Sequence, residues 1–173
     1  MKLEHLDLDW RQPEALKRHY QLGHEAETVA TLKFEKSCGS LATGVFGADQ
    51  WTFKRSGFLS PRVSIRKAGS EIDHAIFTPS RTGSGWAAFD TGRRYHLRAT
   101  NFWATEWAFE AEDGSQLVVL TGPHGLFKQG GHIHVGASAT GLPETPVLLL
   151  LIWYLRVLMN DDASAAAVVV ACG

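Results

Sequence analysis

The stretch Pro143 to Met159, PETPVLLLLIWYLRVLM, is an apolar run that follows a sequence with the alternation of β-structure. It contains no glycine, and no proline after its fourth residue, so it can form about four turns of helix. The residues from Val147 to Leu155 are all apolar or aromatic, which makes every face of that helix apolar. A helix of this kind must be buried in protein or in lipid. We therefore predict one buried helix over residues 144–159.

Protein is the better surrounding for this helix, because crossing a bilayer needs roughly 20 apolar residues. The run is interrupted at Arg156, after fewer residues than that. Asn160, Asp161 and Asp162 then predict a turn that stops the helix, and the tail over residues 160–173 is expected to fray or to add a short β-segment. Arg156 needs the solvent or a carboxylate, and Asp161 or Asp162 is the expected partner.

Eleven short segments before the helix have the composition of β-strands and are separated by turn residues. They are Glu27–Phe34, Ser40–Phe46, Gln50–Lys54, Arg62–Arg66, Ile72–Phe77, Gly85–Phe89, Arg94–Ala99, Ala104–Glu110, Gln116–Leu120, Leu126–Lys128 and His132–Val135. Alternation places Trp51 and Phe53 on one face of their strand, and Tyr95 and Leu97 on one face of theirs. Because only one face of each strand is apolar, the segments predict an antiparallel sandwich or barrel. Its apolar faces can enclose the helix.

Length and composition predict a single domain over residues 1–173. The chain is 45% hydrophobic and has a formal net charge of -1, which gives no global basicity for nucleic acid and no acidic, disordered composition. Cys38 and Cys172 lie far apart and show no zinc-site spacing, so two reduced thiols are expected. The N-terminus, MKLEHLDLDW, lacks the apolar segment of a secretory signal. These features predict a cytoplasmic protein that is not transmembrane.

Three strand motifs and the closing helix resemble the tubby C-terminal-like superfamily, which includes the LURP-one-related and phospholipid-scramblase-like proteins. The motifs are WTFKRSGF (51–58), PRVSIR (61–66) and NFWATEWAFEAEDG (101–114), followed by PETPVLLLLIWYLRVL. The resemblance implies a closed antiparallel barrel of about twelve strands that encloses a hydrophobic C-terminal helix. A closed barrel has no exposed strand edge, and a helix in its lumen must be apolar on all sides.

Basic residues concentrate between residues 54 and 98, where nine Lys or Arg stand against three Asp or Glu. Alternation turns several of them outward, away from the apolar face. Tubby proteins bind phosphoinositides through outward basic residues on neighbouring strands, so the resemblance implies anionic lipid binding, with peripheral membrane association. The residues that match are Lys54, Arg62, Arg66, Arg94 and Arg98. The alternative interpretation is an ordinary solvated face, because any half-buried strand carries charge on one side.

Signals for catalysis are few. His132 and His134 share a face of one strand, and His124 precedes them, but a metal site needs another ligand and the next carboxylate is the distant Glu144. The chain has no GxSxG elbow, phosphate loop or DxDxDG calcium loop, so neither an enzyme nor a scramblase is predicted, and no cofactor. Three hypotheses stay open. They are a barrel that binds anionic lipid, a protein-interaction scaffold, and a metal-dependent enzyme that uses the His124, His132 and His134 region.

Overall fold

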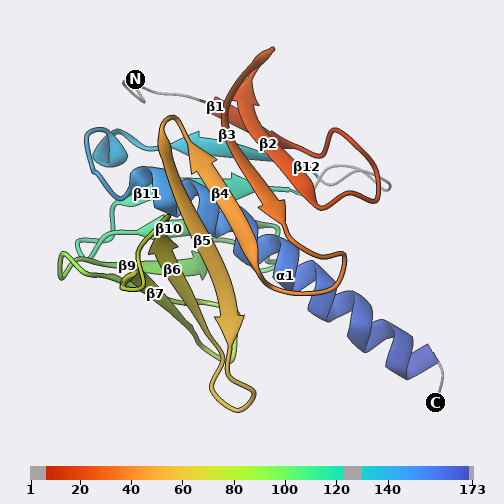
Figure 1. The fold of residues 1–173 in the computed structure, drawn as a ribbon. Coiled ribbons are helices and arrows are strands. Elements are labelled where there is room, and N and C mark those ends of the chain that lie inside the picture. The colour runs from red at the N-terminus through yellow and green to blue at the C-terminus, as the bar shows by residue number, and fades with distance from the viewer. Residues whose placement is uncertain (1–6, 123–129, 172–173) are drawn as a thin grey trace.

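Twelve antiparallel strands form a closed barrel around one helix in the computed structural model, which describes residues 7–122 and 130–171 (Figure 1). Each strand pairs with the next one along the chain, and β1 pairs with β12 to close the barrel. The predicted architecture, a closed antiparallel barrel enclosing a C-terminal helix, is confirmed.

The elements follow one another without interruption by a second unit. The strands are β1 Asp7–Arg11, β2 His19–His24, β3 Glu27–Phe34, β4 Ala42–Phe46, β5 Asp49–Ser56, β6 Arg62–Lys67, β7 Asp73–Pro79, β8 Gly85–Phe89, β9 Arg94–Ala99, β10 Glu106–Glu110, β11 Gln116–Thr121 and β12 Gly130–Val135. A short 3-10 turn, η1 (Ala137–Ala139), leads into the helix α1 (Thr145–Ala171).

Two strands, β1 and β2, were not predicted from the sequence. In β1 the buried Leu8 and Trp10 alternate with exposed charged residues. With only two apolar residues, the sequence of this segment resembles an acidic chain end more than a strand. Its pairing with β12 closes the barrel, and it places Asp7 opposite His134 and Asp9 opposite His132. The predicted strand over residues 126–128 falls outside the described residues.

The helix fills the barrel lumen, as its sequence predicts. Residues Val147 to Leu155 are at most 6% exposed, and Trp153 stacks on Trp10 of β1 with ring centroids 5.6 Å apart. Glycines on the barrel wall allow this close approach. A Cβ at Gly131 would lie 2.9 Å from the ring of Trp153, and a Cβ at Gly44 would lie 3.0 Å from Leu150.

The end of the helix and the partner of Arg156 were predicted wrongly. Helix α1 continues through Asp161 and Asp162 to Ala171 instead of stopping near residue 159. Asp161 pairs with Arg18 and Asp162 with Arg55, so neither neutralises Arg156. Burial of the Arg156 side chain lowers its pKa, and its buried Nε has no hydrogen-bond partner among the described residues. The alanines that follow favour helix, which explains why the acidic pair does not end it.

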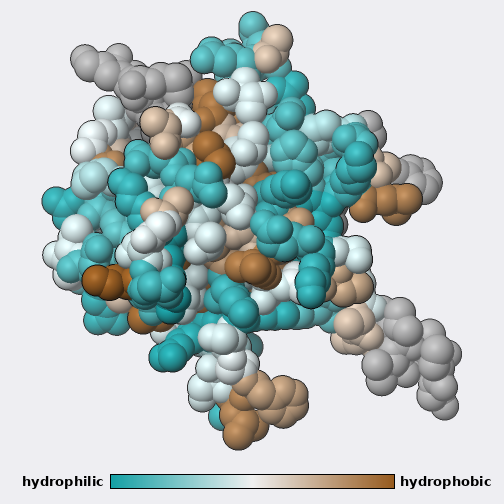
Figure 2. Space-filling model, viewed as in Figure 1, coloured by the Kyte–Doolittle hydropathy of each residue, from teal (hydrophilic) through white to brown (hydrophobic). Residues whose placement is uncertain are grey.

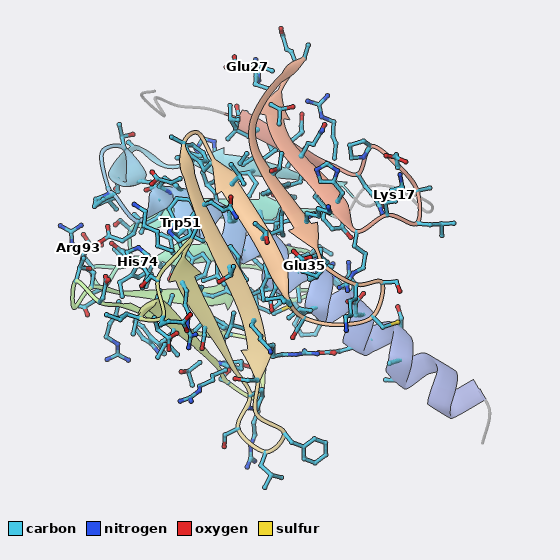
Figure 3. The ribbon with its side chains drawn as sticks, in the orientation of Figure 1. Lys17, Glu27, Glu35, Trp51, His74 and Arg93 are labelled. Atoms are coloured by element: carbon cyan, nitrogen blue, oxygen red, sulfur yellow. The ribbon has the colours of Figure 1, made fainter. Side chains whose placement is uncertain are left out.

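The two ends of the barrel differ, and Arg93 and Lys17 mark them in Figure 3. Helix α1 enters at the end near Arg93 and leaves at the end near Lys17, which we call the exit end (Figure 1). Because the strands run up and down in turn, alternate loops meet at the exit end. Those described are the loops over residues 12–18, 35–41, 57–61, 80–84 and 100–105.

Tyr154 ties the helix to the wall near the exit end, and this contact predicts loss of stability at high pH. Its hydroxyl donates to the Ser40 carbonyl at 2.6 Å and accepts from the Arg55 amide at 3.0 Å. Burial raises the pKa of Tyr154 to about 12 from an ordinary value of 10.0. The protonated phenol is thus favoured in the folded state. Its contribution is complete below pH 10 and is lost as the pH rises toward 12, by roughly 3 kcal/mol.

We therefore expect alkaline unfolding between about pH 10 and pH 12. Burial also raises the pKa of Tyr20 and of Tyr95, so all three tyrosines of the chain should resist ionisation while it is folded. Phenolate absorbance should rise together with the loss of far-ultraviolet circular dichroism. Full phenolate absorbance near pH 10 in a protein that keeps its circular dichroism would contradict this prediction.

Candidate anion-binding site

The five basic residues predicted as a site all lie on the outer wall, but in two groups. Lys54 lies opposite Ser64 on β6, beside Arg62 and Arg66. Arg94 and Arg98 lie on β9, with β7 and β8 in between. Three strand spacings of about 4.8 Å separate β6 from β9, or roughly 14 Å. One small headgroup therefore does not meet all five residues.

Two of the five already have carboxylate partners. The Arg66 Nε donates to Asp73 Oδ1 at 2.6 Å, and its Nη1 donates to Glu71 Oε2 at 3.3 Å. The bond to Asp73 is the main cause that raises the pKa of Arg66. On β9 and β10, the Arg98 Nε lies 2.8 Å from Glu110 Oε2. A ligand anion would have to displace these carboxylates, so neither arginine is well suited to bind one.

Arg94 has an aromatic partner, and no ion pair with an acid among the residues that the structure describes. Its guanidinium lies 4.8 Å from the ring centroid of Trp86 on β8, and Trp86 stacks on His96 with centroids 4.6 Å apart. Trp86 is 38% exposed. A cation over an exposed aromatic face is held by about 0.5–1 kcal/mol, which leaves its N–H donors available to solvent or to an anion.

Lys54 and Arg62 form no ion pair with any of the described residues, and Arg62 lies on the rim of a pocket. The pocket has a volume of about 540 Å³ and opens at the exit end, between the β5–β6 loop, the β7–β8 loop and α1. Its walls include the apolar side chains of Val63, Phe77 and Leu158. An apolar interior with cations at the rim suits a ligand that carries both an anion and an apolar part.

Arg81, in the β7–β8 loop, also lines this pocket and was missed by the sequence analysis. The same loop holds three hydroxyls in mutual hydrogen bonds, with Ser80 Oγ 2.6 Å from Ser84 Oγ and 3.0 Å from Thr82 Oγ1. Gly83, at φ 81°, adopts the left-handed conformation that this tight turn needs. The loop is polar and irregular, so no alternation pattern distinguishes Arg81 from any other exposed cation.

Arg55 also lines the pocket, but its charge is balanced. Its guanidinium donates to both carboxylate oxygens of Asp162, at 2.6 and 3.0 Å, and the bond to Asp162 is the main cause that raises the pKa of Arg55. This two-point contact fixes helix α1 at the barrel mouth. The cations on the rim that lack a carboxylate partner in the described part of the chain are Arg62 and Arg81.

The histidines of β12 bond to the acids of β1 rather than to one another. Nδ1 of His132 lies 3.0 Å from Asp9 Oδ1, and Nδ1 of His134 lies 2.9 Å from Asp7 Oδ1. The bond from His134 is the main cause that lowers the pKa of Asp7. Within residues 7–122 and 130–171, no group of three potential ligands is arranged to hold a metal ion. His124 lies outside the described residues.

Comparison with known proteins finds no match: no family model, no curated protein and no solved structure matches this chain. In the described part of the chain, no helix combines the length and the apolar content that crossing a bilayer requires.

Proposed function

We propose that this chain is a non-catalytic barrel that binds an anionic lipid headgroup, of the phosphoinositide type, at Lys54, Arg62 and Arg81. The observation that carries the proposal is the pairing of uncompensated cations with an apolar pocket at the barrel mouth. Because α1 fills the lumen, a ligand has to bind outside it or at its rim. The resemblance to tubby-like proteins supports the same function.

The chemistry of the rim fits a phosphate better than a carboxylate. Arg62 and Arg81 each offer a planar group of N–H donors that can contact two phosphate oxygens at once. Lys54 adds a mobile ammonium on the neighbouring strand. The hydroxyls of Ser80 and Ser84 bond to each other in the same loop as Arg81, and either can turn from that bond to donate to a bound anion. The apolar walls below can contact the glycerol and the first methylenes of a lipid.

Reversing two of these charges should abolish headgroup binding without unfolding the barrel. We expect the double variant Lys54→Glu and Arg62→Glu to bind vesicles containing phosphatidylinositol phosphate at least thirtyfold more weakly, since each cation near an anionic surface contributes about 1 kcal/mol. Its stability should change by about 0.5 kcal/mol or less per residue, because both side chains are exposed. Vesicle cosedimentation and thermal melting measure the two effects.

A matched control removes the same charge from another part of the outer wall. Lys33→Glu with Lys67→Glu, on β3 and β6, changes the net charge equally but leaves the pocket rim intact. We expect this control to bind vesicles nearly as well as the unmodified protein. Equal weakening by both double variants would show that only overall charge matters. Unmodified protein that ignores anionic vesicles at low ionic strength would exclude the lipid function and favour a protein-interaction scaffold.

A further inference from the structure

Large apolar side chains gather at the tips of the exit-end loops, where none of the described residues covers them. Phe58 and Leu59 are 99% and 91% exposed in the β5–β6 loop, and Phe102 and Trp103 are 92% and 79% exposed in the β9–β10 loop. Leu16, in the β1–β2 loop, is 97% exposed. Figure 2 shows brown, hydrophobic atoms at the tip of the β5–β6 loop, at the bottom of the molecule.

This placement is uneven over the molecule. Among the described residues, eight large hydrophobic side chains are exposed, and six of them, including the less exposed Leu41, lie in exit-end loops. Of the other two, Ile72 lies at the opposite end and Trp86 on the outer wall. Leu16 adopts φ 72°, a left-handed conformation that costs a leucine about 1 kcal/mol or more. At 97% exposure, the Leu16 side chain buries almost no surface against the described residues that could offset that cost.

Charged residues are also distributed unequally between the loops at the two ends of the barrel. The described exit-end loops carry four Lys or Arg against two Glu, namely Lys17, Arg18, Lys36 and Arg81 against Glu14 and Glu35. The loops at the opposite end carry one arginine against six acids, namely Arg93 against Glu25, Glu71, Asp90, Glu112, Asp113 and Glu144. Helix α1 adds Asp161 and Asp162 at the exit end, where each is paired with an arginine. The exit end is therefore much less acidic than the opposite end, and an anionic surface favours it over the other.

Helix α1 projects from the barrel at the exit end as well (Figure 1). After Asp162 the sequence carries no charged residue, and Ala163 to Ala166 are exposed. The helical residues 163–171 extend about 13 Å at 1.5 Å each. That length is enough to reach into one leaflet of a bilayer whose hydrocarbon core is about 30 Å thick. The pairs of Asp161 with Arg18 and Asp162 with Arg55 would then lie at headgroup level.

We infer that the exit end is a membrane-docking surface, on which the loop tips and the projecting end of α1 insert into one leaflet while Lys36 and Arg81 contact anionic headgroups. This inference rests on the proposed function and specifies how the protein meets the lipid. A bilayer fits these features better than a folded protein does, because the apolar tips are separate projections around the barrel mouth. The deformable surface of a bilayer accepts several such projections, whereas a folded protein partner would need a complementary pocket for each of them.

The loop tips are tested by removing their apolar side chains. We expect the variant with Leu16→Ser, Phe58→Ser, Phe102→Ser and Trp103→Ser, none of which lines the pocket, to bind vesicles of phosphatidylcholine and phosphatidylinositol phosphate at least a hundredfold more weakly. Because these side chains are almost fully exposed, its melting temperature should match that of the unmodified protein. Binding of soluble inositol phosphate should be unchanged, since the pocket rim is intact. The control Ile72→Ser removes an exposed apolar side chain from the opposite end, and its vesicle binding should be unchanged.

Insertion itself is tested by fluorescence quenching with lipids brominated on their acyl chains. Bromolipid should quench part of the tryptophan emission of the bound protein, and Trp103→Phe should remove that quenching while Trp86→Phe keeps it. If the four-site variant binds vesicles like the unmodified protein, or if Trp103 is not quenched, the docking inference is overturned. The headgroup proposal then still stands, provided that Lys54→Glu with Arg62→Glu abolishes binding. Loop variants that lose self-association but keep vesicle binding would assign the tips to a second copy of this chain.

Discussion

Replacing Trp153 by alanine should lower the free energy of unfolding by about 3 to 5 kcal/mol, enough to unfold most of a domain of ordinary stability. Trp153 is 1% exposed at the centre of the lumen. Its ring stacks on Trp10 and meets Tyr20 edge to face, each with centroids 5.6 Å apart. A closed barrel cannot collapse easily onto the cavity that the missing ring leaves, so the cost should lie at the upper end of this range.

Urea unfolding followed by circular dichroism measures this effect. Trp153→Phe should be less damaging than Trp153→Ala, because it retains an aromatic ring and removes an indole N–H that has no hydrogen-bond partner among the described residues. Trp86→Ala serves as the matched control on the outer wall, where the ring is 38% exposed, and should cost about 1 kcal/mol. If the midpoint of Trp153→Ala equals that of the unmodified protein, the helix does not form the core of the barrel.

The sequence predicts most strands and the enclosed helix well because alternation and the apolar run are local signals. The choice of a closed barrel over a sandwich came from the resemblance. Val63 and Ile65 are buried, and Arg62 and Arg66 point outward from the same strand, as their two-residue period requires. The same reasoning misses β1, where only Leu8 and Trp10 are apolar. Such a short strand is recognisable mainly by its partner β12, which lies more than a hundred residues further along the chain.

The candidate site is less predictable, because it depends on which charges become neighbours. Alternation places Arg66 on the outer face but does not reveal Asp73, since a register shift next to Arg66 brings the two together. The acids Asp161 and Asp162 were expected to stop the helix. Their partners Arg18 and Arg55 lie 143 and 107 residues away in the chain, a separation that no local pattern reports.

Together with Trp153, Glu144 is the residue on which we predict the stability of the barrel to depend most. From the sequence alone it was considered only as a distant metal ligand. Its side chain is 1% exposed at the start of α1, and its carbonyl accepts the first helical bond, from the Leu148 amide at 3.0 Å. The carboxylate accepts from Thr91 Oγ1 at 3.1 Å, Arg93 Nη1 at 2.9 Å and the Tyr95 hydroxyl at 3.4 Å. Negative charge is also favourable at a helix N-terminus.

Glu144→Ala should therefore cost about 2 to 4 kcal/mol, because it leaves buried donors without an acceptor at the helix start. The cost stays below that of a fully buried ion pair, since the Arg93 side chain is 51% exposed and can return to water. Glu144→Gln keeps an acceptor of the same size and should cost roughly half as much. Urea unfolding of both variants and of Arg93→Ala measures the contributions. A Glu144→Ala variant within about 0.5 kcal/mol of the unmodified protein would show that packing of the apolar helix alone holds α1 in the barrel.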